Sequence, residues 1–224
     1  MPKSPPFSPK AMFLAIFALA FLFTFIQIGA ISIVFEKLGL SQHSAIVLLF
    51  ASLFGSGINL PVFSVEADAK THEELPWYLR SLLQKPRIPF TGRTVIAMNV
   101  GGGLIPVAFS LYLMLYHHLP FSNILLAIAI TSAISYVVSR PIPGFGIGMP
   151  IFVAPICAAL VAVIINPEMS APLAYICGTM GVLIGADLFR LKDIRHMGVP
   201  IASIGGAGTF DGIFITGIVA VLLA

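Results

Sequence analysis

The sequence predicts an all-α membrane protein with about seven transmembrane helices and a cytoplasmic N-terminus. Hydrophobic residues make up 58% of the 224 residues and charged residues only 9%, a balance typical of an integral membrane protein rather than a soluble domain. The charged residues gather between long apolar stretches, and the last two stretches each contain an aspartate. The net charge of +3 does not indicate a nucleic-acid partner, because the basic residues flank the apolar stretches.

The apolar stretches divide the chain into its expected spans. After a Pro- and Ser-rich lead-in, residues 1–10, we treat residues 11–224 as a single membrane domain. About 20 apolar residues suffice to cross a bilayer as a helix. The expected spans are residues 11–35, 43–60, 99–118, 124–139, 152–165, 171–189 and 199–224.

The distribution of lysine and arginine sets the expected orientation. With the N-terminus in the cytoplasm and the spans alternating in direction, all 12 lysines and arginines except Lys37 fall on the cytoplasmic side. The positive-inside rule describes this kind of asymmetry. We therefore expect a multi-pass protein with the lipid bilayer as its surroundings.

The longest polar region, residues 64–93, is expected to be a cytoplasmic loop that carries an interfacial helix. A capping box, Thr-His-Glu-Glu at residues 71–74, opens it, and four residues then follow at helical spacing: Leu75, Leu79, Leu82 and Leu83. We expect an amphipathic helix from about residue 72 to residue 84 in the membrane interface. Strand-like patterns at residues 62–65 and 94–98 also predict a short β-ribbon.

A second irregular segment, residues 140–150, is rich in proline and glycine and is not expected to form a continuous helix. Non-helical backbone beside apolar spans needs protein or a water-filled cavity around it to satisfy its polar groups. The segment lies on the same expected side as the two aspartates. We therefore expect it to shape a substrate cleft there, through Pro143, Gly144 and Gly146.

The two aspartates, Asp187 and Asp211, are the candidate catalytic residues. An acid inside an apolar span costs several kcal/mol and marks a functional site by default. At ~1.5 Å per residue, Asp187 lies roughly 24 Å from the start of its span and Asp211 roughly 20 Å from the end of its own. In a hydrocarbon core about 30 Å thick, both carboxyl groups would lie at similar depth near the cytoplasmic boundary.

Two carboxyl groups at one depth on consecutive antiparallel spans can share a single proton. An aspartyl hydrolase uses such a pair, one carboxylate to activate water and the other acid to donate to the carbonyl. The glycines before the second acid, Gly205, Gly206 and Gly208, would let an extended substrate approach the backbone closely. The sequence thus indicates an intramembrane aspartyl protease that hydrolyses peptide bonds of membrane substrates.

Two other interpretations of the same acids remain open. In a structural interpretation, Asp211 is a helix N-cap and Asp187 pairs with Arg190 or Arg195. In a small transporter or channel, the acids would bind a cation or a proton. No cofactor is expected, and no metal either, because the acidic cluster Glu66, Asp68, His72, Glu73 and Glu74 fits no metal-binding spacing.

Three motifs carry a resemblance to known proteins: Gly101-Gly-Gly-Leu-Ile-Pro106, Gly185-Ala-Asp187 and Ser203-Ile-Gly-Gly-Ala-Gly-Thr-Phe-Asp-Gly-Ile-Phe214. From about residue 11 on, the chain resembles a prokaryotic membrane family known as domain of unknown function sixteen-fourteen, which implies a prokaryotic cell membrane but no activity.

The placement of one aspartate on each of the last two spans is similar, more distantly, to the presenilin, signal-peptide-peptidase and prepilin-peptidase group of intramembrane aspartyl proteases. That resemblance implies a catalytic pair and a membrane peptide as substrate. The sequence departs from the group at two positions: Phe210 replaces the glycine before the second acid, and Ala186 replaces the tyrosine that presenilin-like proteases have before the first.

Overall fold

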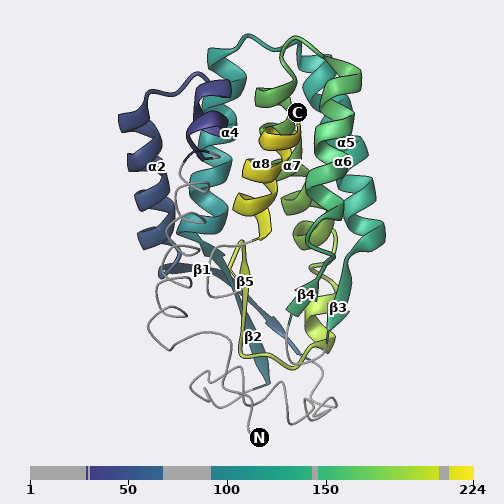
Figure 1. The fold of residues 1–224 in the computed structure, drawn as a ribbon. Coiled ribbons are helices and arrows are strands. Elements are labelled where there is room, and N and C mark those ends of the chain that lie inside the picture. The colour runs from purple at the N-terminus through teal and green to yellow at the C-terminus, as the bar shows by residue number, and fades with distance from the viewer. Residues whose placement is uncertain (1–28, 30, 68–91, 143–145, 207–211) are drawn as a thin grey trace, which may run out of the picture.

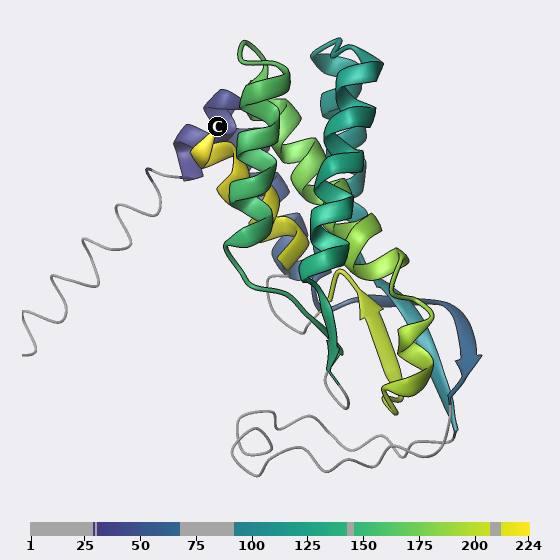
Figure 2. The same cartoon turned by 90° about the vertical axis from the view of Figure 1, so that its right-hand side faces the viewer.

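A bundle of helices stands on a small β-sheet in this protein, as the view in Figure 1 shows with the bundle at the top. The computed structural model describes residues 29, 31–67, 92–142, 146–206 and 212–224. In Figure 2, turned by a quarter, the sheet and a separate β-hairpin extend from the same end of the bundle. Residues from distant parts of the sequence therefore meet where bundle and sheet join.

The bundle is built from apolar α-helices. They are α2 (Gln42–Gly55), α4 (Ile105–Tyr116), α5 (Phe121–Val138), α6 (Val153–Ile165), α7 (Ser170–Val182) and α8 (Gly212–Leu223). Two π-helical turns lie at the sheet end: η1 (Val100–Leu104) leads into α4, and η2 (Leu183–Leu188) continues α7. A short 3-10 turn, η3 (Asp193–His196), follows η2.

Helix α7 lies at the centre of the bundle, and its residues 173–177 are fully buried. Small residues let its neighbours approach this closely. A side chain at Gly178 would meet Ala158 of α6 at 3.3 Å and Thr216 of α8 at 3.4 Å, and one at Gly181 would overlap the side chain of Thr131 in α5. Close approach of helices through small residues is the usual mode of packing in membranes.

Helices α7 and α8 run antiparallel. Ser170, the first residue of α7, donates a hydrogen bond from Oγ to the carbonyl oxygen of Ala224 at 3.2 Å, just beyond the end of α8. A side chain at Gly217, near the middle of α8, would meet Thr179 of α7 at 2.8 Å. The end of η2 and the start of α8 therefore both lie toward the sheet.

The sheet has the strand order β1-β2-β5, formed by β1 (Asn59–Glu66), β2 (Arg93–Asn99) and β5 (Ile201–Ile204). Strands β1 and β2 are antiparallel, which confirms the ribbon predicted at residues 62–65 and 94–98. Strand β5 adds in parallel to β2, from Val95 opposite Ile201 to Met98 opposite Ile204. This third strand was not predicted, because residues 201–204 were assigned to the last span.

The segment at residues 140–150 is not a continuous helix, as predicted. It forms an antiparallel hairpin of β3 (Arg140–Ile142) and β4 (Gly146–Gly148). Ile147 of β4 and Met149, just after the hairpin, pack against a buried cluster that includes Ala186 of η2. The hairpin thus contributes to the same core as the residue before Asp187.

Two helices in the described residues are long and apolar enough to cross a membrane: α5, and the continuous helix of α7 and η2 over Ser170–Leu188. Helix Ile31–Lys37 and α2, bent by 113°, would make a third if the pair counts as one span. Large apolar side chains on α5, such as Leu125 at 58% and Val137 at 74%, are exposed. These features indicate a membrane protein.

Seven spans are not supported. Several of the expected stretches mix a helix with other structure: residues 59–60 belong to β1, and residues 201–204 form β5. The remaining helices are shorter, 13 residues in α6 and 12 in α8. The expected lead-in, the first part of the first span and the interfacial helix at residues 72–84 lie outside the described residues.

Candidate functional site

Asp187 lies on η2, where the helix that began as α7 widens into a π-helical turn. The amide of Phe189 donates to the carbonyl of Ile184 at 2.9 Å, five residues back, which is the π-helical hydrogen bond. Such turns occur within α-helices frequently at functional sites. Asp187 is half-buried, next to the buried Ala186, and it has an interaction partner.

The two residues before Asp187 fix the position of η2. A side chain at Gly185 would overlap the backbone of Ser132 and approach Ser135 Cβ at 2.9 Å, so η2 lies directly against α5. Ala186 lies in a buried cluster with Ile213, the second residue of α8. Ala186 precedes Asp187 by one residue and Ile213 follows Asp211 by two. Asp211 itself, like Gly208, lies outside the described residues.

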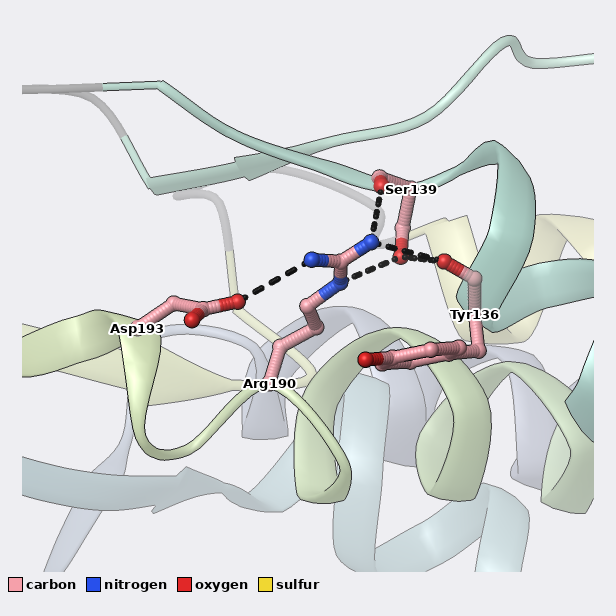
Figure 3. A network of polar contacts seen from close by, with 4 residues as sticks. All are labelled: Tyr136, Ser139, Arg190 and Asp193. Atoms are coloured by element: carbon pink, nitrogen blue, oxygen red, sulfur yellow. Dashed lines mark hydrogen bonds and ion pairs between the residues drawn. The ribbon is translucent and has the colours of Figure 1, made fainter.

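Arg190, one candidate partner of Asp187, bonds to Asp193 and to the end of α5 (Figure 3). Its Nη1 donates to Asp193 Oδ2 at 3.1 Å, and its Nη2 donates to the carbonyls of Tyr136 and Ser139, both at 2.8 Å. Its Nε donates to Ser139 Oγ at 3.3 Å, and the guanidinium lies 4.4 Å above the Tyr136 ring. Cations favour a helix C-terminus, so Arg190 satisfies the last carbonyls of α5.

Two of the glycine-rich motifs meet where the bundle joins the sheet. Gly205 has a φ of +71°, and a side chain there would meet the amide nitrogen of Gly103 at 2.6 Å. A side chain at Gly206 would meet Asn99 Cβ at 2.9 Å. The chain that leads from β5 toward Asp211 therefore runs in direct backbone contact with η1. Glycine is required at Gly205 both by its backbone conformation and by this close approach.

Asn99 holds this junction together, a role the sequence analysis did not assign to it. It is 1% exposed and ends β2. Its Oδ1 accepts from the amide of Gly102 at 2.8 Å, and its Nδ2 donates to the carbonyl of Ser56 at 2.7 Å and to Asn59 Oδ1 at 3.0 Å. Asn59 also accepts from Ser203 Oγ on β5. An asparagine between a strand and a glycine run is a capping signal that could have identified it.

The predicted substrate-facing residues are only partly described. Gly205 and Gly206 lie at the junction with η1, and Gly146 begins β4 of the hairpin with a φ of +137°. Pro143 and Gly144 lie outside the described residues. Of the hairpin, Ile147 packs against the buried cluster that contains Ala186, the residue before Asp187.

Within the described ranges there is no cluster of three or more His, Cys, Asp or Glu side chains that could hold a metal ion. Of the acidic cluster near residue 70, Glu66 is described. Its carboxylate lies 3.6 Å from Arg93 Nη2, and both side chains are exposed. Glu66 is therefore part of a surface ion pair between β1 and β2, a type of contact that contributes little to stability.

The fold and the site together define a helical membrane protein whose two motif regions join a bundle to a sheet. The chain belongs to the family described as "Protein of unknown function (DUF1614)", whose model matches residues 53–223. This match confirms the family resemblance expected from the three motifs. No curated protein and no solved structure matches the chain.

Proposed function

We propose that the chain is an intramembrane aspartyl protease, a multi-pass protein of the prokaryotic cell membrane with Asp187 and Asp211 as its catalytic pair. The observation that supports this most is the shared buried cluster of Ala186 and Ile213. These residues are the close sequence neighbours of the two acids. Residues one and two positions away from the two acids therefore belong to one buried cluster, which supports the proposal that the acids lie near each other.

The chemistry follows from the low polarity of that location. Two carboxyl groups close together in a poorly solvated site cannot both ionise at low cost, so one proton is shared between them. The ionised partner takes a proton from water as the water attacks the peptide carbonyl, and the protonated partner donates to the carbonyl oxygen. Collapse of the tetrahedral intermediate then releases the amine.

The surroundings suit an extended substrate. Gly205 and Gly206 are packed against Gly103, Asn99 and Ser203, so in the proposal the substrate backbone approaches them from the face away from η1. The hairpin of β3 and β4 packs through Ile147 against the buried cluster that contains Ala186, and Gly146 begins β4 without a side chain. In the proposal these two glycine-containing segments flank the substrate backbone, with Gly208, Pro143 and Gly144 as their continuation.

A second candidate function is a carrier for a cation or a proton. It is favoured by the two π-helical turns, η1 and η2, which lie at the same end of the bundle and contain glycine. Interrupted helices with acidic residues are typical of ion sites in transporters. In this case Asp187 and Asp211 would bind the ion, and no peptide would be cleaved.

The test uses the full chain, reconstituted in liposomes with single-span reporter peptides of varied sequence. Asp187→Asn and Asp211→Asn should each abolish cleavage, because each removes one half of the acid pair. Asp193→Asn is the matched control: it changes an aspartate six residues from Asp187 that pairs with Arg190, and it should keep cleavage. Melting temperatures of all variants show whether the fold is retained.

Three results would contradict the protease. The first is full cleavage by Asp187→Asn. The second is equal loss of cleavage in Asp193→Asn and in Asp187→Asn. The third is absence of cleavage by the wild type together with an acid-dependent proton or cation flux in the same liposomes, which would support the carrier.

A further inference from the structure

We propose that the end of the bundle beside the sheet carries a binding site for anionic phospholipid headgroups, formed by Arg140, Lys192 and Arg195. We call these three residues the basic rim. The site is separate from the proposed acid pair and does not depend on proteolysis. Three observations support this site: the positions of the three cations, the pairing of Asp193 with Arg190, and the aromatic residues Tyr136 and Phe189.

The basic rim is brought together by the contacts of Arg190. Its hydrogen bonds to the carbonyl and Oγ of Ser139 tie the segment that enters β3 to the turn that enters η3. Arg140 follows Ser139 directly, and Lys192 and Arg195 follow Arg190 by two and five residues. The three cations, which come from two distant parts of the sequence, therefore lie at the same end of the bundle, where α5 and η2 end.

The rim is left with a net positive charge. Asp193, the acid in the same turn, is paired with Arg190 at 3.1 Å. All three rim side chains are exposed, and among the described residues none of them forms an ion pair or a side-chain hydrogen bond. On the opposite side of η3, Ile194 and Met197 are 3% and 2% exposed and pack in the core. The turn thus anchors itself through apolar residues and presents its cations outward.

The residues beneath the rim place it at a membrane surface. Helix α5 ends at Val138 and the helix of α7 and η2 ends at Leu188, so both helices long enough to cross a bilayer end here. Tyr136 and Phe189, 42% and 58% exposed, form an edge-to-face pair with centroids 6.0 Å apart, and Figure 3 shows Tyr136 below the Arg190 guanidinium. Aromatic residues with cations just beyond them are typical of the headgroup level.

The other end of the bundle has the opposite balance of charge. Its described Asp, Glu, Lys and Arg residues are Glu36, Lys37 and Glu168, beside the histidines His43, His117 and His118. The Lys37 ammonium donates to the carbonyl of Val221 at 3.4 Å. Anionic lipids would therefore be favoured at the rim and not at that end. Each cation beside a span raises the affinity for anionic headgroups about five-fold, which corresponds to ~1 kcal/mol.

The experiment measures lipid binding to the full chain in a neutral detergent by native mass spectrometry. Short-chain phosphatidylglycerol is titrated against phosphatidylcholine of equal chain length. We expect the wild type to bind phosphatidylglycerol more tightly and to lose that preference as salt rises. Arg140→Gln, Lys192→Gln and Arg195→Gln should each weaken phosphatidylglycerol binding by about five-fold. Their melting temperatures without anionic lipid should match the wild type, because the three side chains are exposed.

Lys37→Gln is the matched control, since it removes one cation at the other end and should leave the lipid preference unchanged. The proposal is overturned if the triple rim variant binds phosphatidylglycerol like the wild type, or if Lys37→Gln weakens binding equally. It is also overturned if the wild type does not discriminate between the two lipids. Inorganic phosphate that competes as well as the lipid would show a soluble-anion site instead.

Discussion

Replacing Arg190 tests how the end of α5 is fixed to the turn after η2. Its side chain is 18% exposed and donates to two main-chain carbonyls at 2.8 Å, to a hydroxyl and to Asp193. Hydrogen bonds from a charged donor contribute about 1.5–3 kcal/mol each when buried, and the contact with Tyr136 about 0.5–1 kcal/mol. Because the network is partly solvated, we expect Arg190→Ala to lower the free energy of unfolding by about 3 kcal/mol.

For a chain of this length, such a loss lowers the melting temperature by roughly 6–12 °C, measured by thermal unfolding in nanodiscs. Arg190→Lys keeps the charge but not the planar fork, and it should lose about half as much. Asp193→Asn, which removes only the half-exposed acid, should cost about 1 kcal/mol or less. A lysine variant as stable as the wild type would refute the role of the fork. An alanine variant that melts at the wild-type temperature would refute the whole network.

Two further variants test the junction between bundle and sheet, each by melting temperature. Gly205→Ala adds steric overlap to the strain of a positive φ, so it should lower the free energy of unfolding by about 3 kcal/mol or more. The control Gly92→Ala, with φ of +79° and open space around it, should lower it by only about 1 kcal/mol. Equal losses would contradict the close contact. Asn99→Ala removes one buried and two partly buried hydrogen bonds and should cost about 1–3 kcal/mol. Asn123→Ala, near the start of α5, should cost less than about 1 kcal/mol. A stable Asn99→Ala would show that the junction does not depend on this residue.

Local patterns in the sequence predicted local structure well. Alternation at residues 62–65 and 94–98 indicated two strands, and proline and glycine at residues 140–150 excluded a helix; both predictions are confirmed. Strand β5 escaped prediction for a physical reason. Four residues of apolar sequence fit a strand or a helix equally, and the partner that decides the matter, β2, lies about a hundred residues earlier. The prediction of seven spans was wrong for the same reason, because residues 59–60 and 201–204 were assigned to spans and belong to strands.

The candidate site shows a similar division. Asp187 is on the last turn of a long apolar helix, as its position in the sequence predicted, but the widening of that turn into a π-helix has no signal in residues 183–188. Asp187 and Asp193 are each three residues from Arg190, so sequence spacing alone could not choose between them. The bond to Asp193 accompanies the contacts of the guanidinium with the C-terminal end of α5, which lies about fifty residues earlier in the sequence. The pairing of Asp187 with Asp211 stays a prediction.

The parallel pairing of β2 with β5 has a consequence for how the protein is made. Thr94 Oγ1 donates to the carbonyl of Val199 at 2.6 Å across 105 residues of sequence. At a synthesis rate of about 5–20 residues per second, β2 waits roughly 5–20 seconds after leaving the ribosome before its partner emerges. During that time one edge of β2 is unpaired, and an unpaired edge can join the wrong strand. If the ribosome stalls before residue 204, the helices of the nascent chain can insert into the membrane, but β2 lacks its partner β5. The unpaired edge of β2 is then accessible to chaperones and proteases.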